Sequence, residues 1–355
     1  MTRRMWNHGW KAWASKTAVI VTAVLCITGA AGCAEDTGET AEREFFAMDT
    51  YMNFTAYGPE AEGALEKAKN EINRLENLWS VTREESDIYQ ANRSGGKPVT
   101  VHDETAELLS FALDMAEETG GALDPTLYPV LEAWGFTTGE YRVPAAEELT
   151  ALLARTGYEK VSLESSTLTL PEGMELDLGA VGKGYAGELA AELLREAGVS
   201  SALLDLGGNI QAVGTRPDGT KWRIGLRNPY GEGTIGTLEI ADCAVITSGN
   251  YERYFEGDDG QVYGHILNPD TGYPADSGLA SVTVVTPEGK RGDALSTALF
   301  VMGEEGAKTY WQEHPDFDMI LITEDGRILI TEGIAENFSL AASFSGMEIQ
   351  TIELK

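Results

Sequence analysis

The stretch Met174-Glu-Leu-Asp-Leu-Gly-Ala-Val-Gly-Lys-Gly-Tyr-Ala-Gly187 decides how the middle of this chain is interpreted. It predicts a strand that ends near Leu178, a glycine-rich turn and the start of a helix. The apolar residues of that helix share one face: Ala186, Leu189, Ala190, Leu193 and Leu194. A strand-like segment follows at 201–213. Because glycines let backbone amides approach a phosphate, and Lys183 and the helix start add positive charge, the stretch predicts a phosphate-binding turn.

Two phosphate-binding motifs can be compared with this stretch. Gly182-Lys-Gly-Tyr-Ala-Gly187 fits the G-x-G-x-x-G fingerprint, and Asp205 lies close to where dinucleotide-binding folds keep a ribose-binding acid. This match makes a nicotinamide-dependent dehydrogenase one alternative, although the strand ends earlier than the fingerprint requires. The P-loop pattern does not fit, because Asp177 replaces its first glycine and Gly184 replaces its Ser or Thr. A purely structural glycine turn is a further interpretation.

The rest of the chain mixes helical and strand patterns without the regular alternation of a doubly wound sheet. Apolar residues at three- and four-residue spacing predict helices over 60–78 and 105–118. Near the C-terminus, strand-like runs at 317–323 and 327–331 flank Glu324-Asp325-Gly326 and predict a β-hairpin. We expect an α+β fold, with mixed and antiparallel sheets flanked by helices and two intimately packed lobes.

The N-terminal segment predicts export and a lipid anchor. Residues 1–32 contain basic but no acidic residues, an apolar run and then small residues directly before Cys33, as in the bacterial lipobox. This pattern predicts a signal peptide over 1–32, lipidation of Cys33, a polar tether over 33–44 and a folded domain over 45–350. The mature protein is then expected on the extracytoplasmic face of the cell membrane. A transmembrane anchor is the other interpretation, but the apolar run is shorter than the ~20 residues that a bilayer needs.

Charge and cysteine content narrow the function further. The formal net charge is −31, and loss of the signal peptide would make it more negative, which argues against a nucleic-acid partner. Of the three cysteines, Cys26 leaves with the signal peptide and Cys33 is lipidated, so no internal disulfide is expected. The remaining Cys243 stands in an apolar run and is expected to be buried rather than reactive.

Six short blocks occur in a fixed order between about Met48 and Gly303. They are Met48-Asp-Thr50; Leu123-Asp-Pro-Thr126 with Trp134-Gly-Phe136; Asp177-Leu-Gly-Ala-Val-Gly-Lys-Gly184; Leu206-Gly-Gly-Asn209; Thr247-Ser-Gly-Asn-Tyr251 with His265-Ile-Leu-Asn-Pro269 and Thr271-Gly272; and Gly292-Asp-Ala-Leu-Ser-Thr-Ala-Leu299. Together they resemble the ApbE-like FAD:protein FMN transferase family. Asn209, Asn250 and Asn268 depart from the family pattern, which often has Asp there, and this leaves substrate preference more open than reaction type.

The resemblance implies a magnesium-dependent transfer of FMN from FAD to a Thr or Ser hydroxyl of an acceptor protein, with release of AMP. It implies acceptors among outward-facing subunits of membrane redox pumps and related flavin-carrier domains. It also implies that Asp293, Thr297 and the carbonyl of Ala180 hold the magnesium, with Ser296 near or in its shell. Asp293 and Thr297 are four residues apart, on one face of a helical pattern. Without the resemblance, Asp293 is better interpreted as a helix cap.

The resemblance also implies a set of FAD contacts: Met48, Asp124, Lys183, Thr247, Ser248, Gly249 and His265. An imidazole can accept a hydroxyl proton near neutral pH, so His265 is expected to act as general base or to orient phosphate, with a structural histidine as the alternative. His102 and His314 are interpreted as surface residues. Tyr128 and Trp134 are candidates for stacking on a ring, and a buried structural role for Trp134 is equally open.

Three other functions stay open at this point. If water replaced the acceptor hydroxyl, the same site would be an FAD pyrophosphatase. A lipoprotein that captures FAD without catalysis is the second. The nicotinamide dehydrogenase, which rests on the glycine fingerprint alone, is the third.

Overall fold

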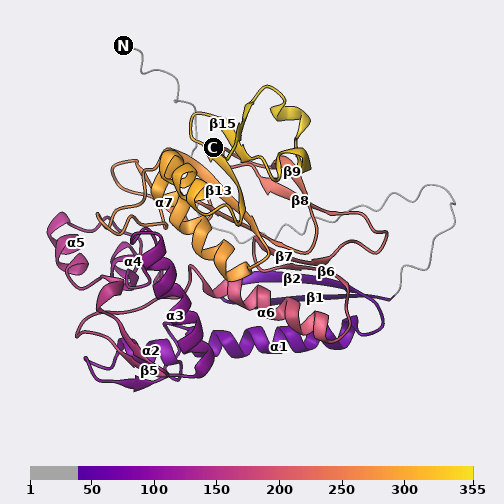
Figure 1. Ribbon diagram of the computed structural model, residues 1–355. Helices are drawn as coiled ribbons and strands as arrows, with labels where there is room; N and C mark the ends of the chain where they lie inside the picture. Colours follow the sequence, from indigo (N-terminus) through magenta and orange to yellow (C-terminus); the bar gives the residue numbers. More distant parts are fainter. Residues whose placement is uncertain (1–38, 355) are drawn as a thin grey trace, which may run out of the picture. The chain divides into compact units, whose positions relative to one another are not determined.

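A nine-stranded sheet is the centre of the part that the structure, a computed structural model, describes: residues 39–354 (Figure 1). Its strands, in spatial order, are β1 (Thr40–Ala47), β2 (Thr50–Tyr57), β6 (Ser201–Asp205), β7 (Asn209–Gly214), β10 (Ala244–Gly249), β13 (Leu279–Thr286), β14 (Asp318–Thr323), β15 (Arg327–Thr331) and β17 (Glu348–Ile352). Neighbours are antiparallel except β15 and β17, which are parallel. The α+β class with mixed sheet is confirmed, within one compact unit.

Different layers cover the two faces of this sheet. Three long helices pack on one face: α1 (Ala61–Trp79), α6 (Gly182–Glu196) and α7 (Gly289–Glu313). The other face carries a three-stranded sheet of β8 (Trp222–Arg227), β9 (Thr234–Ile240) and β16 (Phe338–Leu340). Side chains point alternately to the two faces of a strand, so the sheet has a hydrophobic core on each face. In β2, Phe54 packs in the core under the helices, and Tyr57 packs in the core under β8 and β9.

A smaller set of elements stands beside the large sheet. It consists of α2 (Asp87–Asn92), β3 (Val99–Thr100), α3 (Asp103–Glu118), α4 (Tyr128–Trp134), α5 (Ala146–Leu153), η1 (Tyr158–Lys160), β4 (Ser162–Glu164), β5 (Thr167–Thr169), β11 (Tyr254–Glu256) and β12 (Val262–Gly264). Two short turns, η2 (Ala335–Asn337) and η3 (Ala342–Phe344), flank β16. The predicted helices 60–78 and 105–118 are confirmed as α1 and α3. In the described residues, no helix combines the length and the apolar character needed to cross a membrane.

The predicted boundaries of the folded part need correction. The signal peptide 1–32 and Cys33 lie outside the described residues, but the expected tether 33–44 overlaps β1, which begins at Thr40. The polar residues there are not a tether, because Arg43 is held against α1 by ion pairs with Glu62 and, at 3.3 Å, with Glu66. The sheet also continues past the expected end at 350, since β17 runs to Ile352.

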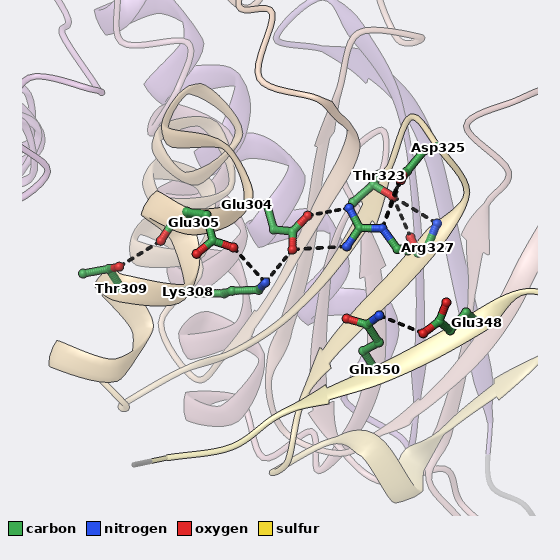
Figure 2. Close-up of polar contacts among 9 residues, drawn as sticks. All are labelled: Glu304, Glu305, Lys308, Thr309, Thr323, Asp325, Arg327, Glu348 and Gln350. Atoms are coloured by element: carbon green, nitrogen blue, oxygen red, sulfur yellow. Dashed lines mark hydrogen bonds and ion pairs between the residues drawn. The ribbon is translucent and has the colours of Figure 1, made fainter.

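Helix α7 is fixed to the C-terminal hairpin by a polar network (Figure 2). The guanidinium of Arg327 binds both carboxylate oxygens of Glu304, at 2.7 and 3.2 Å, and Lys308 bridges Glu304 and Glu305. The predicted hairpin at 317–331 is confirmed as β14 and β15. Gly303, with φ of 73°, bends α7, so its second half follows this hairpin while its first half points toward the cleft described below.

The stretch that was expected to be a strand and a glycine turn has a different structure. Residues 174–178 form no regular strand; Glu175 makes one isolated bridge to Leu127, and the side chain of Asn92 binds both backbone groups of Leu176, at 2.7 and 2.9 Å. The glycines of 182–187 lie inside the first turns of α6, not in a turn before it. The dinucleotide fingerprint is therefore wrong for this chain, because its sheet is antiparallel here and its glycines do not form the required loop.

Gly184 is required by the crossing of two helices. A Cβ at Gly184 would lie 2.2 Å from the carbonyl oxygen of Gly289 in α7, and a Cβ at Gly289 would lie 2.4 Å from the carbonyl oxygen of Gly184. Both distances are far below a van der Waals contact, so α6 and α7 can approach this closely only with glycine at both positions.

We expect Gly184→Ala to lower the free energy of unfolding by roughly 3 kcal/mol, because the added methyl group forces the two helices apart. Gly182→Ala is the matched control: its Cβ would meet a ring carbon of Trp79 at 3.7 Å, an ordinary contact, and alanine favours the helix. Urea denaturation followed by circular dichroism measures both. Equal stability of the two variants would contradict the crossing constraint.

Candidate active site

A cleft of about 840 Å³ lies beside the N-terminal ends of α6 and α7. It is bordered by the loop before α4, the β6–β7 turn, strand β8 and the end of β10. Most of the residues proposed from the sequence line it: Asp124, Ala180, Lys183, Thr247, Ser248, Gly249, His265, Asp293 and Thr297. Met48 and Ser296 do not line it. The structure thus gathers residues from five segments that are far apart in the chain.

Asp293 is a buried carboxylate of the cleft that two hydrogen bonds hold in place. Its side chain is in the second turn of α7, which begins at Gly289, so the alternative that Asp293 caps a helix is wrong. Only 5% of the residue is exposed; Oδ2 accepts a hydrogen bond from the Gly184 N–H at 2.8 Å, and Oδ1 accepts one from the Asn209 amide at 3.0 Å. Each oxygen keeps a lone pair for a further partner.

Three hydroxyl groups form a cluster where the end of β10 meets α7. Ser248 Oγ lies 2.8 Å from Ser296 Oγ and 3.4 Å from Thr297 Oγ1. Ser296 is fully buried and donates to the Asp293 carbonyl at 3.0 Å. Ser296 therefore supports Ser248 and the helix backbone, while Thr297 and Ser248 border the cleft.

These groups fit a magnesium ion by their chemistry. The carboxylate of Asp293, the hydroxyl of Thr297 and the Ala180 residue border the same cleft, and magnesium prefers such hard oxygen ligands. Within residues 39–354, no group of three or more His, Cys, Asp or Glu side chains is placed to hold a metal. A metal here would have few protein ligands, which suits magnesium because it usually keeps several waters.

His265 is half-buried in the cleft wall and has one free ring nitrogen. Its Nδ1 lies 3.2 Å from the Arg253 carbonyl oxygen, which can only accept a hydrogen bond, so Nδ1 carries the proton and Nε2 is left as an acceptor. Burial lowers the pKa of His265 to about 4, and the positive charges of Arg253 and Lys183 act in the same direction. His265 is therefore neutral at pH 7. His102 and His314 are confirmed as surface residues.

Lys183 and the acidic residues give the cleft a mixed charge. Lys183 extends from the first turn of α6 and lines the cleft, as expected, although not from a glycine turn. Asp124 accepts hydrogen bonds from the Thr126 backbone N–H, at 2.8 Å, and hydroxyl, at 2.6 Å, yet burial raises the pKa of Asp124. Burial also raises the pKa of Asp177, another residue of the lining.

Met48, predicted as an FAD contact, lies in a turn beside the cleft. Met48 and Asp49 have φ of 49° and 60°, and they form the two-residue connection between Ala47 and Thr50, which pair across β1 and β2. Met48 packs against the main core, and it is Thr50 that lines the cleft. This turn fits closely over Gly207, where a Cβ would lie 1.9 Å from Thr50 Oγ1.

The two ring-stacking candidates have different positions. Trp134 is fully buried, and its Nε1 donates to the Gly272 carbonyl at 2.7 Å, so its role is structural. Tyr128 lines the cleft and stays a candidate. Cys243, in the turn before β10, is largely buried, and burial raises its pKa to about 11, as expected for an unreactive thiol.

Sequence reasoning missed several residues of the cleft. Three arginines, Arg223, Arg227 and Arg253, line it, and Arg253 forms an ion pair with Asp49 of the β1–β2 turn. Asp205, considered above as a ribose-binding acid, was not missed; it lines the cleft, and its Oδ1 accepts from Gly208 N–H at 2.8 Å and closes the β6–β7 turn. No local pattern marks the three arginines, because β8 and the β10–β11 loop reach the cleft only through the tertiary fold.

The comparisons with known proteins point to one family. The ApbE family model matches residues 48–321. Among the similar curated proteins, the FAD:protein FMN transferase of Treponema pallidum is 34% identical, covering 89% of this chain and 93% of its own length, and that of Klebsiella pneumoniae is 36% identical, covering 76% and 84%.

Solved structures of the family share the fold. The ApbE protein of Thermotoga maritima superposes with a TM-score of 0.77 at 32% identity, covering 87% of this chain and 99% of that one. The apo flavinyl transferase ApbE of Pseudomonas stutzeri gives a TM-score of 0.77 at 28% identity, covering 86% and 99%.

We expect His265 to titrate near pH 4, because burial and two cations disfavour its protonated form. Arg253→Met removes one cation, so the pKa of His265 should rise by about one unit toward its ordinary value. Arg216→Met, at an exposed position outside the cleft lining, should leave it unchanged. Histidine NMR titration between pH 3 and 8 measures all three proteins, and a pKa of 6.5 or above in the unaltered protein would contradict the structure.

Proposed function

The chain belongs to the ApbE family, and we propose that its cleft transfers FMN from FAD to a Thr or Ser hydroxyl of an acceptor flavoprotein. The observation that carries this proposal is the gathering of Asp293, Thr297, Lys183 and His265 in one cleft. An oxygen-rich metal site and a cation can stabilise the charge of the phosphates during phosphoryl transfer, and a neutral imidazole can accept the proton of the attacking hydroxyl.

The reaction is a displacement at phosphorus. The acceptor oxygen forms a bond to the phosphorus on the FMN side of FAD, and the bond from that phosphorus to the bridging oxygen breaks. AMP leaves with the bridging oxygen, and the acceptor loses its hydroxyl proton. The product is a phosphoester-linked flavoprotein.

The proposed magnesium ligands are Asp293, Thr297 and Ala180. Ser296 is proposed to support them through its hydrogen bonds to the Asp293 carbonyl and to Ser248. When bound, magnesium would neutralise negative charge on the phosphate oxygens. The chain positions its carboxylate in advance, because Gly184 and Asn209 fix both oxygens of Asp293 before any ligand arrives. Such preorganisation avoids reorganisation cost during the reaction.

The remaining proposed contacts divide between proton transfer and FAD binding. His265 offers Nε2 to the acceptor proton and is neutral at pH 7, so it is ready to accept; its low pKa makes it a weak base, which also suits a phosphate-orienting role. Lys183 is proposed to bind the pyrophosphate. Met48, Asp124, Thr247, Ser248 and Gly249 are proposed to contact the rest of FAD.

The proposal also includes export of the enzyme and its attachment to the membrane by a lipid. A signal peptide over 1–32 and a lipid on Cys33 would hold the enzyme at the extracytoplasmic face of the membrane, with a tether that ends before Thr40. Acceptors are then proposed among outward-facing subunits of membrane redox pumps and related flavin-carrier domains. Incorporation of labelled palmitate, lost in Cys33→Ala, tests the anchor.

Mass spectrometry tests the transfer itself. We expect a flavin-carrier domain incubated with the purified chain, FAD and magnesium to gain one FMN residue, and a chelator to prevent the gain. Free FMN and AMP without attachment would instead support an FAD pyrophosphatase. If the amount of FAD does not change, the result would instead support a lipoprotein that binds flavin without catalysis.

We expect Asp293→Asn to weaken magnesium binding by at least about 100-fold, since even the outer partners of metal ligands typically contribute about 10–100-fold. The amide keeps the shape of the side chain but removes the charge. Asp270→Asn, an exposed residue outside the cleft lining, is the control and should bind magnesium normally. Calorimetric magnesium titration in the presence of FAD measures both, and equal affinities would refute the ligand assignment.

A further inference from the structure

We propose that the unpaired edge of β8 is the docking site for the acceptor, which adds an extended, acidic segment as a fourth strand beside β8. This segment would carry the hydroxyl group to the phosphate end of the cleft. The inference rests on the proposed transferase function, and it names the part of the chain that recognises the acceptor.

Strand β8 is at the end of its three-stranded sheet. The order is β16-β9-β8, and residues from Trp222 to Arg227 pair along one edge with β9, from Ile240 to Thr234. Within the described residues, no strand pairs with the other edge. Alternate residues of β8 therefore direct N–H and C=O groups away from β9 with no strand to receive them.

This free edge borders the cleft. Five consecutive residues, 223–227, line it. Successive side chains of a strand point to opposite faces, so one face alone can present only every second residue. The consecutive run means that the backbone edge itself forms the cleft wall.

The side chains of β8 leave that edge accessible. Ile224 and Leu226 are buried in the core beneath the small sheet, and Gly225 has no side chain. The Arg223 and Arg227 side chains are on the outer face, 65% and 59% exposed. Proteins usually block exposed edges, because an open one recruits another strand; here the open edge is confined to the cleft.

The edge leads toward the catalytic groups. Its first residue, Trp222, is at the far end, where Nε1 donates to the Gly214 carbonyl at 3.2 Å. Its last residue, Arg227, lies over the ring of Tyr251 at 5.2 Å. Two residues after Tyr251, the carbonyl of Arg253 binds His265. A peptide paired along the ~17 Å of β8 would thus end near His265.

The charge of the outer face indicates the character of the segment. Arg223 and Arg227 flank Gly225 on one face of β8, in a chain whose formal net charge is −31. Their present partners, Glu239 at 4.0 Å and Glu252 at 3.3 Å, form exposed ion pairs, which are weak and easily exchanged. A segment with carboxylates is attracted here and repelled by most of the remaining surface.

Hydrogen exchange of the β8 amides tests the docking directly, because strand addition protects the backbone. The full chain in detergent would be measured alone, with FAD and magnesium, and with FAD, magnesium and a flavin-carrier domain whose acceptor residue has been replaced by valine. We expect the 222–227 peptide to be protected at least tenfold only when the carrier is present. Protection by FAD alone would assign the edge to the flavin and overturn the proposal, as would no protection.

A charge-reversal pair supplies the kinetic test. We expect the double variant Arg223→Glu and Arg227→Glu to raise the KM for the carrier at least tenfold at saturating FAD, and to raise it more than it raises the dissociation constant of FAD. Arg216→Glu makes the same kind of charge change in the β7–β8 loop, outside the cleft lining, and should change neither. An unaltered KM in the double variant would show that the docked segment of the acceptor is not acidic, and would overturn that part of the proposal.

A wrong docking site and a wrong transferase function would give different results. If the unaltered enzyme attaches FMN to the native carrier but β8 shows no protection, the docking site is wrong and the transferase stands. If no FMN is attached to any carrier, the transferase proposal fails, and the docking site fails with it.

Discussion

The close crossing of α6 and α7 is the constraint on which the site depends. Gly184 and Gly289 let the two backbones touch, and the same approach puts the Gly184 N–H within 2.8 Å of the Asp293 carboxylate. Lys183, one residue earlier on α6, then borders the same cleft as Asp293. A single packing contact thus brings together a cation and a carboxylate that are 110 residues apart in the chain.

Local periodicity was sufficient to predict the elements whose structure is decided by one buried face. Helix α1 and the β14–β15 hairpin follow directly from such patterns, because each buries a regular row of side chains. The prediction of a strand and a turn for 174–187 failed because the structure of this stretch is not decided by one buried face. Its glycines have the composition of a turn, but they lie in a helix, and Gly184 is needed there because of Gly289, a residue that is distant in sequence. Composition alone cannot separate these two uses of glycine.

The candidate site was predictable where ordered motifs carried it, and not where the tertiary fold supplies the residues. Asp124, Lys183, His265 and Asp293 belong to motif blocks, and the structure does gather them. The arginines of β8 belong to no motif, since an alternating strand of a small sheet has the same pattern wherever it packs. The start of the folded domain was placed too late, at residue 45, for a similar reason, because Arg43 of β1 is ordered by ion pairs to α1.

The cations of the cleft connect substrate binding to proton transfer. Burial is the main cause of the low pKa of His265, and Arg253 and Lys183, which suit an anionic pyrophosphate, lower this pKa further in the free protein. A bound diphosphate places negative charge beside the same two cations and offsets their effect, so the pKa of His265 should rise when FAD is present. The imidazole therefore gains basicity when the phosphorus to be attacked is in place, and an empty cleft has little power to activate a hydroxyl.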